Sequence, residues 1–148
     1  LPISSGNVVE YDNIFCPGSA LEHSEAHFPG RGEGLDTGQH YLITETYSFR
    51  VGSYGDYNAW RDMLTKFAGI SIEEQFTDNG KPFSELINFV DNEGVIGPVV
   101  SRKLAKDFTD YFEDAVLDFD EGGVFFELYR SWMKAFEMAS NNGAVVFH

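Results

Sequence analysis

The sequence has few basic residues, one cysteine and no apolar run long enough to cross a membrane. It contains 10 basic against 24 acidic residues, which gives a formal net charge of −14. A surface of this sign repels nucleic-acid phosphates and anionic lipids, so we expect no direct nucleic-acid binding and no membrane partner. Cys16 is the only cysteine, which excludes an internal disulfide. Because the first residues also lack the basic and apolar regions of a signal peptide, we expect a cytoplasmic location.

Catalytic signatures are also missing. The glycine-containing turn at 52–55 precedes a predicted helix, but its spacing matches neither a phosphate-binding P-loop nor the nucleophile elbow of hydrolases. We therefore expect no cofactor. Whether the protein is an enzyme stays open, with a non-enzymatic role favoured.

Apolar residues make up 43% of the sequence and aromatic residues 16%, enough for a packed core. The most informative stretch is residues 101–119, where apolar and acidic side chains separate at the spacing of a helix. Its apolar face contains Leu104, Ala105, Phe108, Tyr111, Phe112, Ala115, Val116 and Phe119. A second amphipathic pattern predicts a helix at 124–141, and the tight link between the two helices predicts that they pack antiparallel.

Two strands are predicted. Alternation of apolar and polar residues predicts a long strand at 40–51, and a short apolar run predicts another at 144–148. We expect both strands in one small, mostly antiparallel sheet packed against three to four helices, of which the two longest form the antiparallel pair. The predicted fold class is therefore α+β, in a single domain over residues 40–148.

Two shorter helices complete the predicted domain. One is expected at 56–68, where Ser53 or Asp56 can cap the start and Gly69 can cap the end. A second, shorter helix is expected with Pro82 in its first turn, where proline is favoured, and a strand over residues 86–90 is the alternative.

Residues 1–39 are rich in glycine and proline, which interrupt helix and strand periodicity, so we expect an irregular arm or loop. Within and beside this arm, His23, His27 and His40 are weak candidates for a metal site. His23 and His27 have the spacing of two ligands on a helix, but the surrounding glycines argue against a helix there. We therefore favour solvated loop histidines and expect no bound metal.

Two stretches resemble a family of bacterial and phage proteins of unknown function. They follow the patterns FRxGSYxxYNxWR, beginning at Phe49, and LINFxDxEGxIGP, beginning at Leu86. The resemblance extends over about residues 40–148 and implies a shared fold and a bacterial or phage origin. It implies no reaction, substrate or cofactor.

Polar residues in and between these motifs form a candidate ligand-binding site. They are Arg50, Ser53, Tyr54, Arg61, Asp91 and Glu93. The predicted strand delivers Arg50 to the start of the helix that contains Arg61, so we expect these two cations to lie near each other. They can hold an anion or a partner carboxylate, or they can pair with nearby acids and serve the fold. For the turn itself we favour a structural role as a helix cap.

Carboxylates occupy the face of the 101–119 helix that lies opposite its apolar residues. We expect an exposed partner-binding face made of Asp107, Asp110, Asp114, Asp118 and Glu121. The acids gather toward the C-terminal end of the predicted helix, where the helix dipole disfavours negative charge. Such a departure from a local rule indicates function, although a solvated helix face is the alternative.

These observations rank two functions. The first is a small acidic binding protein that acts on a basic protein partner. The alternative is a small-molecule-binding or hydrolytic domain, with its site between the 50–61 turn and the 91–97 loop. The sequence leaves the identity of the partner and the oligomeric state open.

Overall fold

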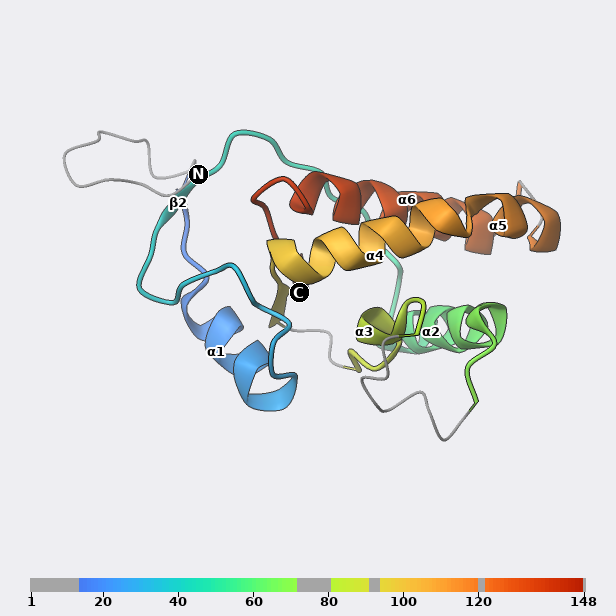
Figure 1. Cartoon of the computed structure of the whole chain (residues 1–148), viewed down its shortest axis with the longest axis horizontal. Helices are drawn as coiled ribbons and strands as arrows, with labels where there is room; N and C mark the ends of the chain where they lie inside the picture. Colours follow the sequence, from blue (N-terminus) through green and yellow to red (C-terminus); the bar gives the residue numbers. More distant parts are fainter. Residues whose placement is uncertain (1–13, 72–80, 91–93, 120–121, 148) are drawn as a thin grey trace.

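The computed structural model describes residues 14–71, 81–90, 94–119 and 122–147. Within these residues the chain forms six helices and two small antiparallel sheets of two strands each, which confirms the α+β class (Figure 1). The helices are α1 (Gly18–His27), α2 (Tyr54–Ala68), α3 (Ser84–Ile87), α4 (Pro98–Asp110), α5 (Phe112–Asp118) and α6 (Val124–Ala139). The strands are β1 (Ile14–Phe15), β2 (Tyr41–Leu42), β3 (Gly94–Ile96) and β4 (Val145–Phe147).

Helices α4 and α6 pack along each other more extensively than any other pair of helices in the described chain, and they run in opposite directions (Figure 1). The predicted helix at 101–119, however, is two helices, because α4 ends at Asp110 and α5 begins at Phe112. At the break, the Tyr129 hydroxyl of α6 donates to the Phe108 carbonyl at 2.6 Å. An unbroken helix would offer that carbonyl to the amide of Phe112.

The sheets differ from the prediction. Of residues 40–51, only Tyr41–Leu42 form a strand, β2, and this strand pairs with β1. Strand β4 pairs instead with β3, so that Val146 lies opposite Val95. The prediction of one sheet containing both 40–51 and 144–148 is therefore wrong.

The alternating pattern at 43–51 arises from contact with a helix. Phe49 packs edge-on against Trp132 of α6, with ring centroids 5.0 Å apart, and the Lys134 ammonium lies 4.3 Å from the centroid of the Tyr47 ring. From Tyr47 onward, alternate side chains are half-buried and exposed. The backbone groups of a helix are already bonded within the helix, so a neighbouring segment cannot form strand hydrogen bonds with it. The 43–51 segment therefore buries one face against α6 without becoming a strand.

A helix also forms where the sequence predicts an irregular arm. Helix α1 packs beside β3, and the buried hydroxyl of Ser24 accepts the amide N–H of Val95 at 2.7 Å. Gly94 permits this close approach, because its φ is +120° and a Cβ there would lie 2.5 Å from the Ser24 hydroxyl. Just after α1, the Arg31 carbonyl accepts the amide N–H of Gly97 at 2.8 Å. This part of the chain is therefore packed into the fold.

An aromatic core fills the space between α2, α4 and α6. Its largest fully buried side chains include Trp60, Phe83, Phe108, Tyr129 and Phe136. Helix α2 has the predicted ends: Ser53 and Asp56 form a reciprocal capping box, and Gly69 ends the helix in the left-handed conformation. In the described part of the chain, no helix is both long enough and apolar enough to span a membrane.

Candidate functional site

The 81–90 segment, which contains α3, is held by side chains from other parts of the chain. Five of its carbonyls accept hydrogen bonds of 2.6–2.9 Å from long polar side chains. The donors are Lys103 to Lys81, Arg31 to Glu85, Arg61 to Ile87, Tyr57 to Phe89 and Tyr54 to Val90. Because α3 is only 4 residues long, helical hydrogen bonds cannot satisfy all the carbonyls of this segment, and these side chains do so instead.

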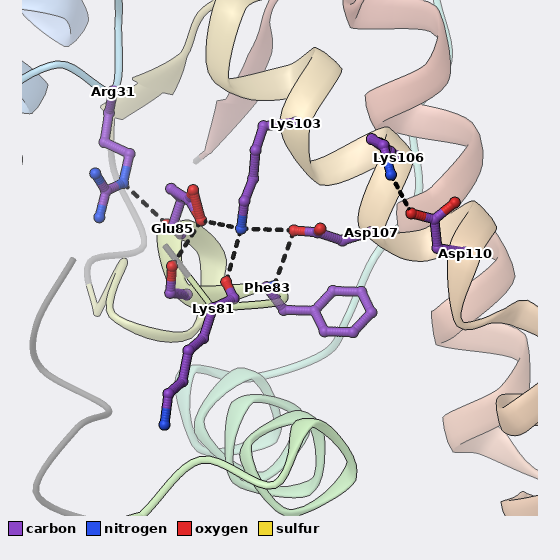
Figure 2. Close-up of polar contacts among 9 residues, drawn as sticks. Arg31, Lys81, Phe83, Glu85, Lys103, Lys106, Asp107 and Asp110 are labelled. Carbon is purple, nitrogen blue, oxygen red and sulfur yellow. Dashed lines mark hydrogen bonds and ion pairs between the residues drawn. The ribbon is translucent and has the colours of Figure 1, made fainter. Parts of the chain in front are cut away.

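An ion cluster joins the 81–90 segment to α4 (Figure 2). The Lys103 ammonium lies 2.6 Å from a carboxylate oxygen of Glu85 and 2.7 Å from one of Asp107. The Asp107 carboxylate also accepts the amide N–H of Phe83 at 3.0 Å. The side chains of Glu85 and Asp107 are only 15% and 13% exposed. Burial raises the pKa of Asp107 above its ordinary 3.8, and its bonds to Lys103 and Phe83 oppose that rise.

Phe83 has an unusual backbone conformation at this cluster. Its φ of +63° lies in the left-handed region, which bulky residues rarely adopt. The ring is fully buried, and its centroid lies 4.8 Å from that of Phe108. Strain of this kind is frequent at functional sites. Here the ring contact and the amide bond to Asp107 both fasten the segment to α4, so a role in the fold accounts for the strain.

Arg61, a predicted ligand-binding residue, is buried and already bound within the protein. Its Nε donates to the Ile87 carbonyl at 2.7 Å, and its Nη1 donates to the side-chain oxygen of Asn58 at 2.7 Å. Burial lowers the pKa of the guanidinium, and the nearby Tyr57 and Tyr54 oppose that change. The Tyr54 hydroxyl is bound to the same segment of backbone. The structure therefore brings Arg61 and Tyr54 to the 81–90 segment, where both satisfy carbonyls.

Ser53 and Arg50, also predicted as ligand-binding residues, have other surroundings. The Ser53 hydroxyl accepts the amide N–H of Asp56 at 3.2 Å, and the Asp56 carboxylate accepts that of Ser53 at 2.7 Å. The Ser53 hydroxyl also donates to the Asp56 carboxylate at 2.9 Å, and the two bonds that Ser53 donates to this carboxylate lower the pKa of Asp56. Arg50 is exposed beside α6. Asp91 and Glu93 lie outside the described residues.

A hollow of about 310 Å³ opens between the 49–51 stretch and the first turns of α6. It is lined by Phe49, Arg50, Val51, Gly122, Val124, Glu127, Leu128 and Ser131. Neither Arg61 nor Tyr54 lines this hollow. The predicted ligand-binding residues are therefore divided between the hollow, the cap of α2 and the 81–90 segment.

The residues of the predicted acidic face also have different surroundings. Asp107 belongs to the ion cluster and is not on an exposed face. Asp110 pairs with a lysine one turn earlier in α4 (Figure 2). Asp114 and Asp118 are exposed on α5, and no described residue forms an ion pair with either. Glu121 lies outside the described residues.

The break before α5 changes the electrostatic argument for these acids. Because α5 begins at Phe112, Glu113 and Asp114 lie in its first turn, where the helix dipole favours negative charge. Of the described acids on α5, only Asp118 lies at the C-terminal end, where the dipole disfavours it. The expected conflict with the dipole therefore remains at Asp118, whereas Glu113 and Asp114 have a favourable position.

The two histidines of α1 lie on one face of the helix. Their ring centroids are 4.4 Å apart, and Nδ1 of His27 lies 3.0 Å from the His23 carbonyl oxygen. The helix that their spacing requires is present, and the expectation of loop histidines is wrong for this pair. His40 is exposed just before β2. Over the described residues, no group of three or more His, Cys, Asp or Glu side chains is arranged to hold a metal ion.

The ion cluster is the feature that sequence reasoning missed. Its one local signal is the four-residue spacing of Lys103 and Asp107, whereas Glu85 lies 18 residues before Lys103 and no pattern links the two. Comparison of the chain with protein-family models, with curated proteins and with solved structures finds no match.

Proposed function

We propose that the protein is a small non-enzymatic binding protein that recognises a basic protein partner through its acidic surface. The observation that supports this most is the exposure of Glu113, Asp114 and Asp118 on α5, where no described residue forms an ion pair with them. Asp107 and Asp110 on α4, in contrast, are paired within the molecule. The net charge of −14 adds a long-range field that attracts cationic surfaces and speeds their association.

The alternative, a small-molecule-binding or hydrolytic domain with its site between the 50–61 turn and the 91–97 loop, has less support. Arg61 and Tyr54 already bind backbone carbonyls, and Ser53 caps α2. A ligand at this place would have to displace those hydrogen bonds. A cytoplasmic location and a bacterial or phage origin accompany the leading proposal and stay predictions.

The test compares two triple variants that remove the same amount of negative charge. The α5 variant carries Glu113→Gln, Asp114→Asn and Asp118→Asn. The control variant changes exposed acids on other parts of the surface and carries Glu22→Gln, Glu45→Gln and Glu137→Gln. Proteins captured from a bacterial lysate are quantified at low and at physiological salt. The association rate of the most enriched basic protein is then measured with each variant.

We expect the α5 variant to bind this protein more slowly and with a flatter salt dependence, because the attracting charges at the contact are gone. The control variant should behave nearly like the wild type. Equal losses in the two variants would mean that net charge alone governs the binding, and the assignment to α5 would then be wrong.

A further inference from the structure

The hollow beside α6 is lined by both apolar and polar side chains. The apolar ones are Phe49, Val51, Val124 and Leu128, and the polar ones are Arg50, Glu127 and Ser131. A volume of about 310 Å³ is enough to accept a large apolar side chain from another molecule. The hollow is formed by the first turns of α6, at the end of the molecule where α5 also lies (Figure 1).

The most exposed large apolar side chains of the described chain lie at this same end. Leu117 of α5 is 83% exposed and Val124 at the start of α6 is 72% exposed. Each of the other exposed large apolar side chains, such as Tyr54, is at most 50% exposed. Val124 also lines the hollow, and exposed apolar side chains of this kind are typical of a surface that another protein covers.

Exposed carboxylates surround these apolar side chains. On α5, Glu113 and Asp114 precede Leu117 by one helical turn and Asp118 follows it directly, and all three acids are exposed. Glu127 follows Val124 by one turn and lines the hollow. The surface therefore combines apolar anchoring points with negative charge.

The geometry points to a cationic amphipathic helix as the occupant of this surface. This inference rests on the proposed function and specifies the chemistry of the basic partner. An apolar side chain of that helix enters the hollow and covers Val124, while its lysine or arginine side chains face the acids of α5. Arg50 lines the hollow and repels other cations, so the basic residues of the bound helix belong away from it, at the acids of α5.

Charge disfavours the other usual occupants of such a surface. A second copy of the chain also has a net charge of −14, so two copies repel each other. An anionic lipid surface is repelled in the same way. A basic amphipathic helix supplies both the apolar anchor and the positive charge that the surface lacks.

Three peptides of equal length test the inference with the full chain. The first is a leucine–lysine peptide with the leucines at helical spacing, the second has the same composition in scrambled order, and the third is polylysine. Binding is measured by fluorescence anisotropy at low and physiological salt. The test variant is Leu117→Gln with Val124→Gln. The matched control is Val99→Gln with Val146→Gln, which changes two other exposed valines. Circular dichroism verifies folding, and Val124→Gln alone replaces the double variant if that variant does not fold.

We expect the wild type to bind the amphipathic peptide at least about tenfold more tightly than the scrambled one. The test variant should lose this preference and keep its weak, salt-dependent binding of polylysine, while the control should retain the preference. Equal binding of all three peptides would overturn the inference and leave the proposed function standing, because charge alone would then select the partner. Absence of binding to any peptide would overturn both.

Two further results would also overturn the inference. A preference for the amphipathic peptide that survives in the test variant would place the contact elsewhere on the surface. Self-association of the wild type that the test variant abolishes, measured by sedimentation, would make a second copy of the chain the occupant.

Discussion

Around the 81–90 segment, charged side chains point inward and are paired, whereas those of α5 face solvent. Lys103 is shared between Glu85 and Asp107, and each of these carboxylates is at most 15% exposed. Helix α5 has three exposed acids and no basic residue in its sequence. The acidity of this chain therefore contributes to folding in one region and leaves an unneutralised surface in the other.

This difference separates the residues that determine stability from those available for recognition. Removing one member of a half-buried charge pair leaves its partner without compensation, which is costly. Changing an exposed side chain usually alters the free energy of unfolding by less than about 0.5 kcal/mol. Substitutions at the 81–90 segment and its partners should therefore affect folding, and substitutions on α5 should affect binding.

The largest effect is expected at Phe83, whose ring is fully buried against Phe108. Phe83→Ala should lower the free energy of unfolding by about 3–5 kcal/mol, because it leaves a cavity in the aromatic core. Urea unfolding followed by tryptophan fluorescence measures this change. Leu117→Ala on α5 is the control and should stay within about 0.5 kcal/mol of the wild type. An unchanged midpoint for Phe83→Ala would show that the segment is not anchored in the core.

The two arginines of the predicted ligand site provide the next comparison. Arg61→Met removes the donors to Ile87 and Asn58 and should cost about 2–3 kcal/mol of unfolding free energy. Arg50→Met, at an exposed position, should leave stability unchanged. Thermal and urea unfolding of the two variants measure the difference. If Arg61→Met keeps full stability yet abolishes the binding of a ligand, the small-molecule function becomes the better proposal.

Two lysines of α4 form ion pairs that differ in exposure, one half-buried and one exposed. Lys103→Met leaves Glu85 and Asp107 without their shared cation and should lower the free energy of unfolding by about 1–2 kcal/mol. This is less than for a fully buried pair, because the Lys103 side chain is 32% exposed. Lys106→Met removes only the exposed pair with Asp110 and should leave stability nearly unchanged, because solvent screens that pair. Urea unfolding of both variants tests this order. Equal losses would mean that burial of the cluster adds nothing to its strength.

Local signals in the sequence predict some of these features. The cap at Ser53 and the stop at Gly69 define α2, because both signals lie within a few residues of the helix ends. The pairing of α4 with α6 follows from two amphipathic patterns joined by a short link. The predicted strand at 40–51 failed because alternation reports burial on one side and does not identify the neighbour, which here is a helix.

The candidate site was less predictable, because its contacts join residues far apart in the chain. Arg61 donates to a carbonyl 26 residues later, and Arg31 donates to one 54 residues later. Such bonds depend on how the helices pack, and no spacing in the sequence indicates them.

A smaller effect is expected in the pH dependence of stability, where two aspartates contribute with opposite signs. Asp107 should titrate above 3.8 because of burial, and Asp56 below 3.8 because Ser53 donates hydrogen bonds to it. The stability contributed by Asp107 is complete below pH 3.8 and is lost as the pH rises through the pKa of Asp107 in the folded protein. The stability contributed by Asp56 is present above pH 3.8 and is lost as the pH falls through the pKa of Asp56 in the folded protein. Carbon-13 NMR of the carboxyl groups measures both values, and the reverse order would contradict the described burial.

Urea unfolding of the α5 triple variant and of Lys103→Met, at low and high salt, tests the central claim most directly. Neutralising Glu113, Asp114 and Asp118 relieves their mutual repulsion, but it also removes the favourable interaction of Glu113 and Asp114 with the dipole of α5, so the triple variant should stay close to the wild type at low salt. Any difference should vanish near 1 M salt, where the Debye length is about 3 Å. Lys103→Met should be less stable than the wild type at both salt concentrations. A triple variant that is clearly less stable than the wild type in both conditions would contradict the claim, because the α5 acids would then serve the fold.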